Sequence, residues 1–339
     1  MRSTPTRRAL TAVVAAALAG ALGTSTAAAS DPTLEKAVEQ LAPTAAQPYT
    51  RVAPEATPLA ASADASNDGW EWTLFQKINV DRIAWSAPPV IRHGSLDAVA
   101  GQWATTQAAA GTFDLDPQVE TKIPAGSHGG IELLYWSAGT DVQYFLEQVA
   151  AAVEVDGLYD NFTDSGIAVV QGGGYLYAYV LLAEYAHSTP QPGELPLYRF
   201  YKPSSGTHFY STSAGERNNV IVYPDYRYEG LVAYIKTPTS TGSGLRDLNR
   251  FYLRSAGTHF YTSSPAEYQA VRTYPQYSLD GVAGRVHSAA GSGLTAMHRF
   301  FRPSSGTHFY TANASEVESV KKIPGYRYEG IAFYLRVAG

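Results

Sequence analysis

One sequence unit occurs three times in the C-terminal part of this chain, and this repetition constrains the fold more than any other feature. Residues 199–235, 250–286 and 299–335 align without a gap. Each copy begins with Arg-Phe-(Tyr/Phe), continues into Gly-Thr-His-Phe-Tyr and later repeats Glu, Val, Pro, Tyr and Gly at fixed offsets. Because repeated units bury their apolar faces against one another, we expect the three copies to share one pseudo-threefold core.

Each copy is expected to fold as two strands, a short helix and a third strand. In the first copy, two aromatic segments flank the turn Pro203–Gly206, which favours a hairpin. Ser213 and Glu216 have the spacing of a helix capping box, so the glutamate is given a capping role and no acid–base role. Pro224 then ends the helix. The repeats therefore predict three ββαβ units, with a β-trefoil-like arrangement as the alternative.

The first residues have the organisation of a secretory signal peptide over 1–29. Arg2, Arg7 and Arg8 precede an apolar stretch, and small residues end the segment at Ala29. Sec and twin-arginine export both remain open. No later stretch approaches the roughly 20 apolar residues of a membrane helix. The sequence predicts a secreted protein, extracellular or associated with the cell wall.

Charge and cysteine content limit the partners of the exported chain. Loss of the three arginines in the signal peptide takes the formal net charge from −5 to −8. Nucleic acid and acidic lipid surfaces need clustered Lys and Arg, so neither is expected as a partner. The chain has no cysteine, so its domains must be held together by burial of apolar surface.

The remaining sequence is divided by composition and periodicity. Residues 30–69 are rich in Ala and Pro and are expected to form a disordered spacer. Residues 70–186 combine helical spacing, at Leu74, Ile78 and Ile83 and in two later stretches, with a hairpin turn at 172–174. We expect an α+β domain there, a Pro-rich linker over 187–196 and a three-repeat domain over 197–339.

The repeats resemble a family of unassigned function that recurs at the C-termini of secreted bacterial proteins, including lysozyme-type cell-wall hydrolases. The resemblance rests on the motif Gly206–Tyr210 with Arg227–Gly230, which the third copy repeats. The second copy departs from it with Ser-Leu-Asp at 278–280. The resemblance implies attachment to a cell wall or recognition of it.

Residues 72–186 resemble the CAP (SCP-like) family, whose fold is an α-β-α sandwich. The resemblance rests on Ile78-Asn79, Arg82, the helical stretch from Leu96 and the segment Asn161–Val170. In that family, two histidines and two glutamates in a cleft can hold a divalent metal. The positions of both histidines and of one glutamate fall here on Leu115, near Val153 and on Gly129, so we expect neither a metal nor another cofactor.

Repeated polar and aromatic residues are the candidates for ligand binding. They are His208, His259 and His308, the tyrosines Tyr210, Tyr261 and Tyr310, and the carboxylates Glu229 and Glu329, with Asp280 in the second copy. The three histidines have three interpretations: a structural role in the strands, a polar contact in a glycan or peptide pocket, or a symmetric metal site. Outside the repeats, Asp114, Asp116, Glu120 and Glu132 are interpreted as a solvated rim.

These observations predict a secreted, non-catalytic binding protein of the cell envelope. It would act as a monomer and recognise cell-wall glycan or another extracellular polysaccharide through its tyrosines. No G-x-S-x-G motif supplies a nucleophile, so no catalytic residue is assigned. Two alternatives remain: an extracellular hydrolase that uses carboxylates of the CAP-like cleft, and a CAP-type protein that sequesters a sterol or lipid.

Overall fold

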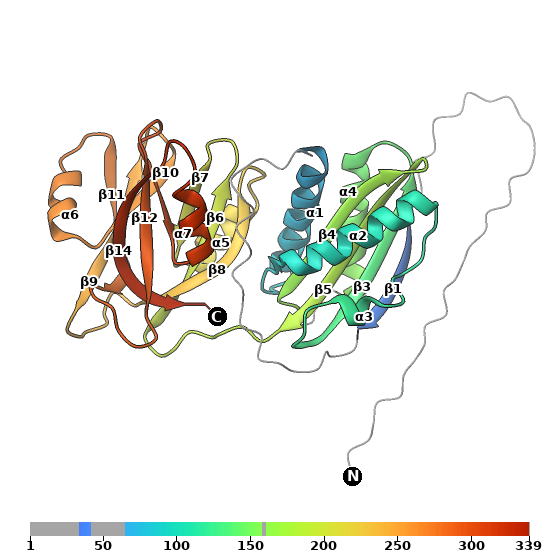
Figure 1. Cartoon of the computed structure of the whole chain (residues 1–339), viewed down its shortest axis with the longest axis horizontal. Helices are drawn as coiled ribbons and strands as arrows, with labels where there is room; N and C mark the ends of the chain where they lie inside the picture. The colour runs from blue at the N-terminus through green and yellow to red at the C-terminus, as the bar shows by residue number, and fades with distance from the viewer. Residues whose placement is uncertain (1–33, 42–64, 158–160, 339) are drawn as a thin grey trace, which may run out of the picture.

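The computed structural model describes residues 34–41, 65–157 and 161–338, which form a mixed α+β structure of two units (Figure 1). The predicted signal peptide and residues 30–33 and 42–64 of the predicted spacer lie outside the described residues. Within the described ranges, no helix combines the length and the apolar character needed to cross a membrane.

The first unit is a five-stranded sheet between two helical layers (Figure 1). Its strands, in the order β1-β3-β5-β4-β2, are β1 (Glu35–Leu41), β2 (Ile91–Arg92), β3 (Ser127–Ala138), β4 (Asp164–Gly172) and β5 (Tyr175–Tyr185). Its helices are α1 (Ala65–Ala84), α2 (Gly94–Ala110), the short α3 (Val119–Lys122) and α4 (Val142–Gly157). The three long helices and the hairpin confirm the elements predicted from periodicity.

Both faces of this sheet are buried. Leu74 of α1 and Leu146 of α4 belong to one apolar cluster with β3 and β5, whereas Leu96 of α2 belongs to a second cluster on the opposite face. The layers therefore follow the order α-β-α. Helix α2 packs closely against β4 at Gly166. A Cβ atom added to this glycine would lie 2.4 Å from the backbone of Leu96.

The prediction of a disordered spacer over 30–69 is wrong for two segments. Residues 35–41 form β1, which pairs antiparallel with β3 from Glu35 opposite Trp136 to Leu41 opposite Gly130. The edge of β3 would otherwise leave backbone N–H and C=O groups unpaired, and a polar segment can satisfy them with little apolar burial of its own. Residues 65–69 form the first turn of α1.

The second unit contains the three repeats, each in the expected order ββαβ. The first copy comprises β6 (Glu194–Lys202), β7 (Thr207–Ser211), α5 (Ala214–Ile221) and β8 (Arg227–Lys236). The second comprises β9 (Leu245–Leu253), β10 (Thr258–Thr262), α6 (Pro265–Val271) and β11 (Tyr277–His287). The third comprises β12 (Thr295–Arg302), β13 (Thr307–Thr311), α7 (Ala314–Val320) and β14 (Arg327–Val337).

Local signals of the repeat are confirmed in part. Ser213 caps α5 by accepting a hydrogen bond from the backbone N–H of Glu216, as the capping spacing predicted. The first strand of each copy begins before the aligned repeat, however. Residues 245–249, between the first two aligned repeats, extend β9 because they pair with β11, and residues 194–196 of the predicted linker begin β6.

The last strands of the three copies close the unit into a ring. β8 pairs with β11, β11 with β14 and β14 with β8, at equivalent positions of the copies. The paired residues are Lys236 with Arg285, His287 with Tyr334, and Arg336 with Tyr234. This cyclic pairing gives the unit a pseudo-threefold axis.

Helix α1 joins the two units through the first copy. The Gln76 side-chain amide donates a hydrogen bond of 2.7 Å to the Ile221 carbonyl oxygen. The Arg227 guanidinium lies 5.2 Å from the ring centroid of Trp72. Tyr228 is buried in the cluster that also contains residues of α1 and α4. The two units therefore share a continuous hydrophobic core.

Candidate functional site

The three tyrosines predicted to bind a ligand form the centre of the repeat unit. Their hydroxyls donate cyclically to backbone carbonyls: Tyr210 to Tyr310 at 2.5 Å, Tyr261 to Tyr210 at 2.5 Å and Tyr310 to Tyr261 at 2.7 Å. All three side chains are buried, and burial raises the pKa of each phenol. The prediction that they present an aromatic binding surface is wrong, because the strand face that carries them faces the axis of the ring.

The three histidines follow the same cyclic rule. His208 packs on Phe309, His259 on Phe209 and His308 on Phe260, with ring centroids 4.5 to 5.2 Å apart. Each histidine thus contacts a phenylalanine of another copy. Among the described residues, no group of three or more His, Asp or Glu side chains is arranged to hold a metal ion. These contacts agree with the structural interpretation of the histidines.

The arginine that opens each copy is the residue whose role the sequence analysis missed. Arg199 pairs with Glu229 of its own copy and with Glu316 of the third copy, at 2.6 and 2.8 Å. Arg250 pairs in the same way with Asp280 and Glu216, and Arg299 pairs with Glu329 and Glu267. The only signal in the sequence was the repetition of this arginine. Its partners include Glu216, for which the sequence predicted only a capping role, and the equivalent residues Glu267 and Glu316.

These three arginine clamps differ in exposure. Arg199 and Glu316, between the first and third copies, are both buried. Glu267, between the second and third copies, keeps about a third of its side chain exposed, and so does Glu216 between the first two copies. Sequence-equivalent charges therefore occupy different environments, and only two of the three clamps are open to solvent.

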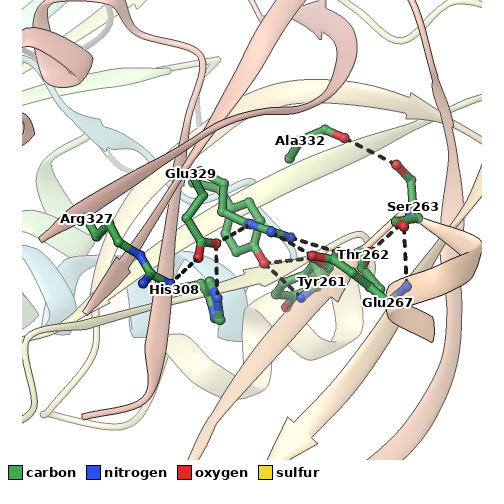
Figure 2. A network of polar contacts seen from close by, with 11 residues as sticks. Tyr261, Thr262, Ser263, Glu267, His308, Arg327, Glu329 and Ala332 are labelled. Atoms are coloured by element: carbon green, nitrogen blue, oxygen red, sulfur yellow. Dashed lines mark hydrogen bonds and ion pairs between the residues drawn. The ribbon is translucent and has the colours of Figure 1, made fainter. Parts of the chain in front are cut away.

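The open clamp between the second and third copies lines a pocket of about 180 Å³. Its walls include Ser263 and Glu267 from one copy and Arg299, Glu329 and Ile331 from the other. Figure 2 shows Glu329 between Arg327 and His308, with Thr262 and Glu267 on the opposite side of the network. Of the residues predicted to bind a ligand, Glu329 is the one that lines this pocket, and Glu229 lies in the buried clamp instead.

Electrostatics hold the pocket in one charge state. Burial alone would raise the pKa of Glu267, but hydrogen bonds from Arg299 and Thr262 outweigh it and lower that pKa. Burial, together with the positive charge of Arg299, lowers the pKa of His308 to about 4. At neutral pH the pocket therefore presents an ionised carboxylate and a guanidinium beside an uncharged imidazole.

In the first unit, the interpretation of four acidic residues as a solvated rim is wrong for two of them. Asp114 and Glu120 are exposed, but Asp116 and Glu132 are buried. Glu132 accepts hydrogen bonds from the Tyr179 hydroxyl and from the backbone N–H of Asp116. Alternation along β3 directs the Glu132 side chain into the layer beneath α2, which the sequence pattern did not reveal.

We expect Glu132 to make stability depend on pH. Burial raises its pKa from 4.5 to about 7, so between these pH values the folded protein holds a proton that the unfolded chain has released. The free energy of unfolding should therefore fall as pH rises from 4.5 to 7, by roughly 3 kcal/mol from this group. Urea unfolding of the wild type and of Glu132→Gln across this range measures the effect. Equal pH slopes for the two proteins would contradict it.

A second polar cluster of the first unit was also missed. His187, just after β5, lies with its Nε2 2.5 Å from Oδ2 of the buried Asp164 at the start of β4, and the Thr163 hydroxyl donates to the same oxygen at 2.6 Å. The His93 ring stacks on Tyr185 with centroids 5.6 Å apart. Contacts between residues so distant in sequence leave no local signal. The cluster ties the linker to the sheet.

Comparison with known families shows which family the C-terminal half of the chain matches. The sequence model of a domain of unknown function, DUF5648, matches residues 168–271 and 247–338. The two matches overlap and together span 168–338, half of the chain. The chain belongs to the DUF5648 family. No curated protein matches it. The first DUF5648 match begins inside β4, so it includes part of the sheet of the first unit as well as the first copy and part of the second.

Proposed function

We propose that this DUF5648 protein is an exported, non-catalytic binding protein that recognises extracellular glycan, such as cell-wall glycan, at the pocket between its second and third copies. The observation that carries the proposal is the pocket itself, in which an arginine and two carboxylates are fixed beside an exposed apolar side chain. Ile331 is 48% exposed, and Tyr328, on the same strand, is 40% exposed.

The chemistry of this pocket suits a sugar unit. The clamp fixes the carboxylates of Glu267 and Glu329, whose remaining lone pairs can accept hydrogen bonds from sugar hydroxyls. Ile331 supplies apolar surface for the C–H face of the ring. Polar groups that fix orientation beside apolar area are typical of small-ligand sites. Because Arg299 keeps Glu267 ionised, this glutamate is not suited to protonate a leaving group, which favours binding over hydrolysis.

The finer fold assignments belong to the same proposal. We propose that the first unit is a degenerate CAP-like domain, which the α-β-α order of its layers supports. For the repeats, the helix in each copy and the cyclic pairing of the last strands favour a pseudo-threefold ββαβ ring over the β-trefoil-like alternative.

The test is retention of the full chain on purified peptidoglycan and on a panel of insoluble polysaccharides. We expect Ile331→Asp to reduce retention at least tenfold, because it places a charge at the apolar side of the pocket. The matched control is Val282→Asp, at the equivalent position of the second copy, where the side chain is 42% exposed. Thermal unfolding checks that both variants keep the fold.

Two results would overturn the glycan proposal. One is that the wild type is retained on no polysaccharide of the panel. The other is that Ile331→Asp and Val282→Asp reduce retention equally, which would mean that the polysaccharide does not bind specifically at the pocket between the second and third copies.

A further inference from the structure

A second pocket, which we call the axial pocket, lies where the closing strands meet on the pseudo-threefold axis. Its volume is about 290 Å³, and it is lined by the ends of β8, β11 and β14 together with residues 191, 194 and 292–294. All three copies contribute to it. The pocket proposed above to bind glycan is formed by the second and third copies only. The two pockets have no lining residue in common.

The axial pocket has a basic wall. Lys236, His287 and Arg336 occupy equivalent positions in the three copies, one residue beyond the aligned repeat, and all of them line the pocket. Arg285 adds a further guanidinium. Each of the three copies therefore contributes one nitrogen-bearing side chain to this wall from the same position of the repeat.

One carboxylate faces these cations. Glu194 pairs with Lys236 at 3.2 Å and with Arg336, and these contacts outweigh burial and lower its pKa to about 2. Arg285 pairs with Asp247, which does not line the pocket. Lys236, Arg285 and Arg336 thus face the carboxylates of Glu194 and Asp247, which leaves one formal positive charge in excess.

The remaining lining is mixed, with the polar Gln191 and Ser292 beside the half-buried Leu294 and the ring of Tyr334. Ile235, Val286 and Leu335, again at equivalent positions, are buried in the central cluster of the ring and form part of the lining. A pocket of this volume is at the lower end of the range for small-molecule sites. Positive charge beside a fixed apolar surface favours a small organic anion over a bare inorganic ion, because an inorganic ion gains nothing from apolar contact.

We propose that the axial pocket binds a small organic acid through its carboxylate group. The carboxylate would be held by Lys236, Arg285 and Arg336, whose positive charges exceed the negative charges of their carboxylate partners by one. The carbon skeleton would pack on the half-buried Leu294 and on the ring of Tyr334. Two sources share this chemistry: a free organic acid and an acidic sugar. Citrate and glucuronate are the probes that separate them, with sulfate as the inorganic reference.

Isothermal titration of the full chain tests the proposal. Ser292 lines the pocket from an exposed loop, so Ser292→Asp adds a carboxylate without removing a cation, and Ser292→Asn is the matched neutral control. We expect saturable binding of citrate or glucuronate, with Kd raised at least tenfold by Ser292→Asp and nearly unchanged by Ser292→Asn. Citrate binding indicates a free acid, and glucuronate binding indicates an acidic sugar.

Three outcomes would overturn the proposal: no binding of either organic anion, sulfate binding as tightly as both, or equal affinity of the wild type and Ser292→Asp. The Ile331→Asp variant separates the two sites, because it should weaken retention on polysaccharide and leave the titration with organic anions unchanged. Failure at one site therefore does not imply failure at the other.

Discussion

Replacing Arg199 by methionine is expected to lower the free energy of unfolding by about 3–5 kcal/mol. Arg199 is 6% exposed and donates two hydrogen bonds, of 2.8 and 2.9 Å, to Glu316, which is 4% exposed. The Glu229 carboxylate lies 2.6 Å from Nε of Arg199. Removal of the guanidinium leaves two carboxylates without their shared cation in a low-dielectric interior, and breaking a buried ion pair from one side has a cost of this size.

The repeats supply the control for this prediction. Arg250→Met removes the equivalent side chain from a clamp whose carboxylates, Glu216 and Asp280, are each about 30% exposed, so water replaces much of the lost interaction. We expect a loss of about 1 kcal/mol there. Urea unfolding of both variants measures the difference. Equal losses for the two would show that burial does not determine the strength of the clamps.

Replacing Tyr310 by phenylalanine is expected to lower the free energy of unfolding by about 2–4 kcal/mol. Its hydroxyl donates to the Tyr261 carbonyl at 2.7 Å and accepts from the Tyr261 backbone N–H at 3.1 Å. Phenylalanine keeps the ring packing but leaves both buried backbone groups without this partner, and each unsatisfied group costs about 1–3 kcal/mol.

Tyr223→Phe is the control for the loss of a tyrosine hydroxyl, because Tyr223 is 57% exposed and its hydroxyl is expected to form hydrogen bonds with water. Thermal and urea unfolding should show no change for this variant. If Tyr310→Phe were as stable as the wild type, the cyclic hydrogen bonds would not contribute to the closure of the repeats. The cyclic hydrogen bonds also imply that changing Tyr210, Tyr261 or Tyr310 to alanine would disrupt the fold, so such variants would not report on ligand binding.

Local signals allowed the elements to be predicted from sequence. Apolar residues at helical spacing located α1, the glycine turn at 172–174 located the β4–β5 hairpin, and Ser213 located the start of α5. These features act over a few residues, so they do not depend on the rest of the chain. The repetition of whole segments also predicted three equivalent ββαβ units, because similar sequences favour similar local structures.

The sequence by itself determined most of the elements, their threefold repetition and the identity of the repeated polar and aromatic residues. Only the tertiary structure decided which of those residues face inward. A tyrosine repeated to close a ring and one repeated to bind a ligand give the same pattern, and the cyclic bonds of Tyr210, Tyr261 and Tyr310 distinguish them. The pairing of β1 with β3, the clamp partners of Arg199 and the axial pocket all join segments far apart in the chain, and no local preference encodes such contacts.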